Sequence, residues 1–160
     1  MGIDNLRLIY FSLIYPYLLY GAEIWGGACR TYLNSLSVIQ KKLIRIMNFK
    51  GRYEHTTTLF HENKMFKLSD VINLQTGIFI YNALNTPVDC GFELPVQNII
   101  TRRPTDLRIP SCRTSHSQQS IAYRGVKFWN QLSQETRNAT SRDLFKSKIK
   151  QTLLDGYRIS

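Results

Sequence analysis

The sequence predicts a mainly α-helical protein, because its apolar residues recur at helical rather than strand spacing in three separate stretches. Four of the five prolines fall between residues 86 and 120, so the flanking regions contain only Pro16. The apolar fraction of 43% is enough to form a core. We therefore expect a small helical domain, a long irregular Pro- and Arg-containing connector, and a C-terminal helical segment.

The first expected element is a helix over residues 5–25 that is apolar on almost every side, which is typical of a buried helix. Pro16 cannot donate a backbone hydrogen bond, so the carbonyl of Ser12 loses its partner and a kink is predicted there. Gly26 and Gly27 end the helix. Its apolar run is shorter than the roughly 20 residues that a membrane-spanning helix needs, so no membrane segment is predicted.

A second helix, over residues 32–48, has the clearest periodicity. Its predicted core-facing arc consists of Leu33, Leu36, Ile39, Leu43, Ile46 and Met47. Its opposite arc carries Lys41, Lys42 and Arg45. A short helix is expected around residues 58–63. Ser69 then predicts the N-cap of another helix, whose apolar stripe contains Val71, Leu74, Ile78 and Tyr81.

Residues 86–120 lack a helical period and are expected to form an extended basic connector with one or two short strands. Order is expected again from Ile121, in a segment that contains Trp129. A last helix should follow Ser141 as its N-cap, with Phe145, Ile149 and Leu153 on one face. The predicted domains are therefore residues 1–85, 86–120 and 121–160.

Charge is the main functional indication, since the chain carries a net charge of +10. Residues 29–68 contribute +6 and residues 101–160 contribute +8, whereas residues 69–100 contribute −3. Such basic blocks favour a polyanion-binding surface, although a merely solvated basic face or a disordered tether would have the same composition. The candidate phosphate-binding residues are Lys41, Lys42, Arg45, Arg102, Arg103, Arg108 and Arg113.

Catalytic patterns are missing from the sequence. Nucleotidyl transfer needs paired carboxylates that hold two metal ions, and no Asp-Asp dipeptide occurs. There is also no nucleophile–His–Asp signature, zinc-protease motif or Gly-rich phosphate loop. The three cysteines have no regular spacing, which favours a reducing compartment, cytoplasm or nucleus. We expect no catalytic residue, metal or cofactor.

Five segments in a fixed order carry a family resemblance. They lie at residues 8–25 (Leu-Ile-Tyr, Tyr-Pro-Tyr, Tyr-Gly and Trp), 39–46, 55–60, 126–132 and 145–150. This succession resembles the region that follows the polymerase core in reverse transcriptases of non-long-terminal-repeat, jockey-like retrotransposons. Two turns depart from the pattern: Val126 follows Gly125 where the family usually has proline, and Ser133 follows Leu132 where proline is also frequent.

The resemblance implies a thumb-like domain at residues 1–85, which would face a template–primer duplex through Lys41, Lys42 and Arg45. The fingers, palm and catalytic carboxylates would lie upstream, so this chain would be a truncated remnant that binds RNA–DNA or duplex backbone without polymerising. One alternative is a helical interaction module, whose first helix docks on a partner protein, on a separately encoded polymerase core or on a second copy. Another is a decayed open reading frame without selected function.

Overall fold

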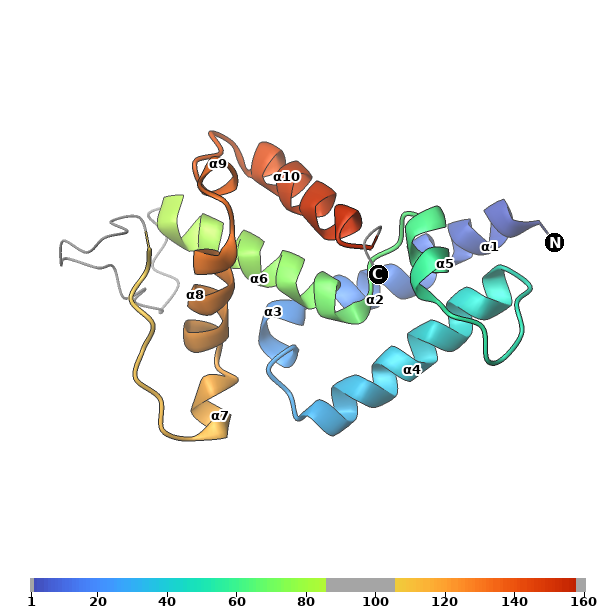
Figure 1. Ribbon diagram of the computed structural model, residues 1–160, viewed down its shortest axis with the longest axis horizontal. Helices are drawn as coiled ribbons and strands as arrows, with labels where there is room; N and C mark the ends of the chain where they lie inside the picture. The colour runs from blue at the N-terminus through green and yellow to red at the C-terminus, as the bar shows by residue number, and fades with distance from the viewer. Residues whose placement is uncertain (1, 86–105, 158–160) are drawn as a thin grey trace. The chain divides into compact units, whose positions relative to one another are not determined.

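The computed structural model describes residues 2–85 and 106–157, and all regular structure in these ranges is helical (Figure 1). The predicted mainly α class is therefore confirmed. Close contacts divide the chain into unit 1, residues Met1–Ile72 with Lys150–Ser160, and unit 2, residues Asn73–Ile149. This division differs from the predicted domains 1–85, 86–120 and 121–160, because the end of the last helix belongs with the N-terminal residues.

The N-terminal segment is helical without a break from Ile3 to Leu19, and a change in hydrogen bonding divides it into three pieces. Tyr15 donates its N–H to the carbonyl of Tyr10, five residues back, so a π-helical turn precedes Pro16. The hydrogen-bonding pattern therefore changes just before Pro16, where a kink was predicted. The prediction that the helix runs on to Trp25 is wrong, because Gly21 adopts a left-handed φ of 63° and separates a fourth piece. The four pieces are α1 (Ile3–Ile9), η1 (Tyr10–Ile14), α2 (Tyr15–Leu19) and α3 (Ala22–Trp25).

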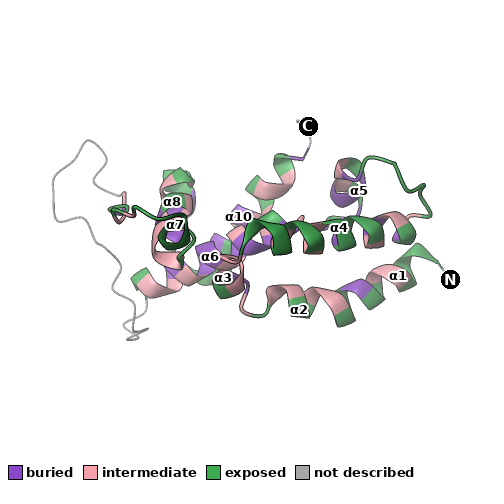
Figure 2. Cartoon of the chain, turned by 90° about the horizontal axis from the view of Figure 1, so that it is seen from below, coloured by how far each residue is buried: buried purple, intermediate pink, exposed green. Residues whose placement is uncertain are grey.

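The long helix of unit 1 is α4 (Arg30–Met47), close to the predicted bounds. Its buried side differs in part from the predicted arc, because Ile39 and Ile46 are exposed while Gln40 and Ile44 are buried. Figure 2 shows α1 and α2 running alongside α4. The helix is rotated so that its contact face centres on Ile44. The core of unit 1 joins Tyr10, Ile44, Met47, Leu59, Phe60, Met65 and Tyr157.

Helix α4 ends in a Schellman motif without glycine. Phe49 has a left-handed φ of 53°, Lys50 donates its N–H to the Arg45 carbonyl at 2.9 Å, and Phe49 donates to Ile46 at 3.1 Å. These bonds satisfy carbonyls at the helix end and fix the start of the following loop. The short helix α5 (Thr57–Glu62) confirms the helix expected near residues 58–63.

Helix α6 (Leu68–Asn85) begins in unit 1 and continues in unit 2. The predicted N-cap is wrong by two positions, because the helix starts at Leu68 and Ser69 lies inside its first turn. The predicted stripe is confirmed, since all four of its members are buried: Val71, Leu74, Ile78 and Tyr81.

Unit 2 is built where α8 (Ile121–Gln131) crosses α6 (Figure 1). A methyl group on Gly125 would come within 3.1 Å of Ile80, so glycine permits this close approach of the helices. Trp129 and Phe145 are buried beside Tyr81, so Trp129 is a core residue. The other helices of this part are α7 (Ser115–Gln118), α9 (Gln134–Arg137) and α10 (Arg142–Asp155).

The remaining predictions concern the connector and the last helix. Ser141 accepts a hydrogen bond from the N–H of Leu144 at 3.2 Å, which confirms the predicted N-cap of α10. Residues 86–105, where most of the connector and its expected strands fall, lie outside the described residues. The described part of the connector contains the short helix α7, which the sequence did not predict.

Candidate nucleic-acid interface

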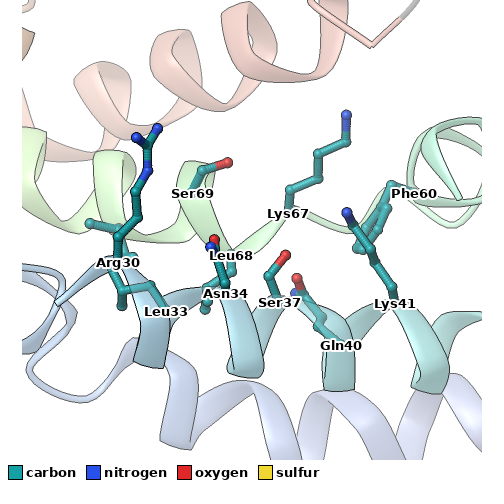
Figure 3. Close-up of a pocket in the computed structure, with 11 residues that line it drawn as sticks. Arg30, Leu33, Asn34, Ser37, Gln40, Lys41, Phe60, Lys67, Leu68 and Ser69 are labelled. Carbon is teal, nitrogen blue, oxygen red and sulfur yellow. The ribbon is translucent and has the colours of Figure 1, made fainter. Parts of the chain in front are cut away.

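A pocket of about 320 Å³ opens between α4 and the start of α6, and we call it the helix pocket. Its polar side chains on α4 follow the spacing of one helix face. Figure 3 shows Asn34, Ser37 and Gln40 projecting from α4 on the side where Ser69 lies. The full lining consists of Arg30, Leu33, Asn34, Ser37, Gln40, Lys41, Phe60, Lys67, Leu68, Ser69 and Ile72.

Three cations surround this pocket. Arg30 and Lys41 come from α4, eleven residues apart, and Lys67 comes from the segment between α5 and α6. Figure 3 shows the three side chains extending in the same direction. Arg30 and Lys41 are exposed, and Lys67 is half-buried. The helix pocket therefore combines positive charge with hydroxyl and amide groups, which suits a phosphate group.

Gln40 fixes the floor of the pocket. It is 3% exposed, and its side-chain amide donates to the Tyr10 hydroxyl at 3.1 Å and to the Phe66 carbonyl at 2.9 Å. Burial raises the pKa of the Tyr10 hydroxyl, so this group remains protonated at neutral pH. The two bonds hold α4 against both the N-terminal helices and the segment that carries Lys67.

Lys67 is positioned by Tyr157, which lies just after the C-terminal end of α10. Its ammonium group lies 4.6 Å from the centroid of the Tyr157 ring, a cation–π contact. Its backbone N–H donates to the Tyr157 hydroxyl at 2.9 Å, and that hydroxyl donates to the Asp70 carboxylate. Burial raises the pKa of Asp70, and burial together with the bond to Asp70 raises the pKa of Tyr157. These contacts hold the backbone and the charge of Lys67 at the pocket.

A second cavity, of about 340 Å³, lies beside the loop that joins α4 to α5, and we call it the loop cavity. Lys41 and Lys67 line both hollows, so the two sites are neighbours that share two positive charges. The lining consists of Lys41, Arg45, Tyr53, Glu54, His55, Thr56, Thr57 and Lys67.

The predicted site residues do not all line the two hollows. Lys41 lines both hollows, and Lys42 is exposed but lines neither. Arg45 lines the loop cavity, and its Nε donates to the Glu54 carbonyl at 2.9 Å, so this guanidinium is anchored to the loop. Arg108 and Arg113 are exposed in unit 2. Arg102 and Arg103 lie outside the described residues.

Sequence reasoning missed Arg30 and Lys67. For Arg30 a signal was present, because residues 30, 34, 37, 41 and 45 follow one stripe of a helix. For Lys67 the sequence nearby gave no signal, since its ammonium group and its backbone N–H contact Tyr157. Lys67 is 90 residues from Tyr157 in the sequence.

No metal site accompanies these cations in the described part of the chain, where no group of three or more His, Cys, Asp or Glu residues is placed to hold an ion. A search for membrane spans among residues 2–85 and 106–157 finds no helix that is long and apolar enough.

Several known proteins are similar to this chain in sequence. The chain is 26% identical over 129 residues to the probable RNA-directed DNA polymerase from transposon X-element of Drosophila melanogaster, covering 73% of this chain and 14% of that protein. Its relatives are RNA-directed DNA polymerases of mobile elements. The polymerase from mobile element jockey of Drosophila funebris is 32% identical over 72 residues, which cover 45% of this chain and 8% of that polymerase.

A third polymerase relative, the probable enzyme from transposon BS of Drosophila melanogaster, is 28% identical over 71 residues, 44% of this chain and 8% of its own length. The resemblance to jockey-like elements is therefore confirmed. The chain spans about a seventh or less of the length of these polymerase relatives. No protein-family model matches the chain. No solved structure matches it either.

Proposed function

We propose that unit 1 binds the sugar–phosphate backbone of nucleic acid, and specifically of an RNA–DNA hybrid. The observation that carries this proposal is the pair of neighbouring hollows that share Lys41 and Lys67. A polymerase that copies RNA into DNA leaves its product paired with the RNA, and the relatives are named as such polymerases. An RNA–DNA hybrid is therefore the ligand that agrees both with the positive charge of this surface and with the named activity of the relatives.

The physical basis of the proposed binding is the release of counterions from the nucleic acid. Each phosphate that a lysine or arginine neutralises releases a condensed cation from the nucleic acid, so binding weakens as salt is added. Arg30, Lys41, Lys67 and Arg45 present positive charge along the two hollows. Phosphate contacts fix the position of a duplex without reading its bases, so we propose binding that is independent of sequence.

The test of this proposal uses two RNA–DNA hybrids of equal length and unrelated sequence. Fluorescence anisotropy should show that the logarithm of affinity falls linearly with the logarithm of salt between about 50 and 200 mM, with the same slope for both hybrids. Binding that is insensitive to salt, or strong for one sequence only, would contradict the proposal.

We further propose that polymerisation resides outside these 160 residues, so that this chain binds a hybrid as a truncated remnant of the enzyme. The sequence has no Asp-Asp dipeptide, and the two-metal chemistry of such enzymes depends on clustered carboxylates. The purified chain is therefore expected to extend no primer with Mg²⁺ or Mn²⁺. Incorporation of labelled nucleotide that persists after removal of contaminating polymerases would overturn this part of the proposal.

A second candidate function, docking on a protein, is favoured by the exposed apolar side chains of the N-terminal segment. Tyr17 is 81% exposed and Ile24 is 78% exposed, and Leu8 and Leu13 are exposed as well. Large apolar side chains exposed in number on one segment are typical of interaction sites. The salt titration also separates the two functions, because apolar docking does not weaken as salt neutralises charge.

A further inference from the structure

Tyr53 is the aromatic residue that the phosphate-binding proposal leaves unexplained. It is 90% exposed, yet it lines the loop cavity beside Lys41 and Arg45. Burial of its ring therefore contributes little to the fold of the isolated chain. An exposed aromatic ring next to cations is the combination that binds unpaired nucleotides, because a base stacks on the ring while the cations hold the phosphates.

The loop that carries Tyr53 is held on both sides of the ring. Before it, the Schellman motif at Phe49 fixes the exit from α4. After it, the Glu54 carbonyl accepts a hydrogen bond from the Arg45 Nε. The Glu54 carboxylate also lies 3.6 Å from the Lys50 ammonium group. A ring on a loop restrained in this way loses less conformational freedom on binding than a ring on a free loop.

The rest of the loop cavity supplies hydrogen-bonding groups rather than apolar walls. Thr56 and Thr57 contribute hydroxyl groups, and His55 contributes an exposed imidazole. These groups can donate to and accept from a base edge or a ribose hydroxyl. An apolar protein segment would leave such groups unpaired, so the chemistry of the cavity favours a nucleotide.

We propose that the loop cavity holds an unpaired nucleotide next to the duplex, with its base stacked on Tyr53 and with Lys41 and Lys67 on the adjoining backbone phosphates. The inference rests on the proposed function and extends it. The ligand is then a hybrid with a single-stranded extension, and the unpaired base supplies affinity that a blunt hybrid lacks.

The experiment compares a blunt RNA–DNA hybrid with the same hybrid carrying a three-nucleotide single-stranded extension. Tyr53→Ala should lower affinity for the extended hybrid by about 5- to 150-fold, the range for losing one stacked base, and should leave blunt binding unchanged. Tyr53→Phe keeps the ring and should retain the preference for the extension. Tyr32→Ala is the matched control, because Tyr32 is also exposed in unit 1 but lines neither hollow.

The two proposals fail in different ways. A wild-type chain that binds neither hybrid overturns the proposed function and this inference together. A wild-type chain that binds both hybrids equally, or a Tyr53→Ala variant that loses the same factor on both, overturns the stacking site and leaves backbone binding intact. 2-Aminopurine at the first unpaired position gives an independent measurement, since stacking on Tyr53 should quench its fluorescence and Tyr53→Ala should restore it.

Discussion

Replacing Lys41 and Lys67 together by glutamine is expected to flatten the salt dependence of hybrid binding. These two residues line both hollows, so each should neutralise a phosphate. Removing one phosphate-binding cation lowers the slope of log affinity against log salt by about 0.9 on B-form DNA, so the double variant should reduce the slope by about 1.8. Glutamine is a good helix former, which protects α4 from the substitution at position 41.

The matched control is Lys42→Gln combined with Lys146→Gln. Both residues are exposed, and neither lines the helix pocket or the loop cavity. This pair removes the same net charge, so it controls for the loss of two positive charges from the chain as a whole. Equal slopes for the two double variants would mean that the diffuse charge of the chain binds the nucleic acid and the hollows do not. Circular dichroism of each variant shows whether its helices are retained.

Phe145→Ala is expected to cause the largest loss of stability. The Phe145 side chain is fully buried, its ring centroid lies 4.5 Å from that of Tyr81, and it lies 5.6 Å from that of Trp129. Truncation of a buried phenylalanine removes apolar burial and leaves a cavity, which costs about 3–5 kcal/mol in the free energy of unfolding. Urea denaturation followed by tryptophan fluorescence measures this loss.

Leu144→Ala is the control for this substitution, because Leu144 is the adjacent residue of α10 and is 43% exposed. Its expected change in the free energy of unfolding is within about 0.5 kcal/mol. If Phe145→Ala leaves too little native protein to measure, Phe145→Leu provides a smaller truncation at the same position. A Phe145 variant as stable as the Leu144 variant would show that this aromatic cluster does not hold unit 2 together.

Periodicity predicted the long helices well, because a helix that buries one face must repeat apolar residues at about 3.6-residue intervals. It did not predict which arc of α4 is buried. Gln40 faces inward because the Tyr10 hydroxyl and the Phe66 carbonyl satisfy its amide, and both partners come from other elements. Ile39 and Ile46 face outward as a result. Hydrophobicity alone would predict that Ile39 and Ile46 are buried and that Gln40 is exposed.

Sequence patterns also failed to predict part of the candidate site, because some of its contacts come from distant residues. Lys41 was predictable as a cation on one face of a helix. Lys67 was not, because its side chain is placed by the ring of Tyr157, a residue far along the chain. The short helices α7 and α9 were also missed. Each has four residues, which is too short for an apolar period to appear.

The contact between Lys67 and Tyr157 has a consequence for the order in which the chain folds. A ribosome releases the N-terminal residues first, so α4 and Lys67 leave it long before Tyr157, which follows α10. Tyr157 joins Lys67 and Asp70 across sequence separations of 90 and 87 residues. Contacts at such separations close late, because the intervening chain must first be ordered. A nascent chain that ends after α6 already carries every cation of the two hollows. It acquires their final arrangement only when Tyr157, beyond the end of α10, has been added.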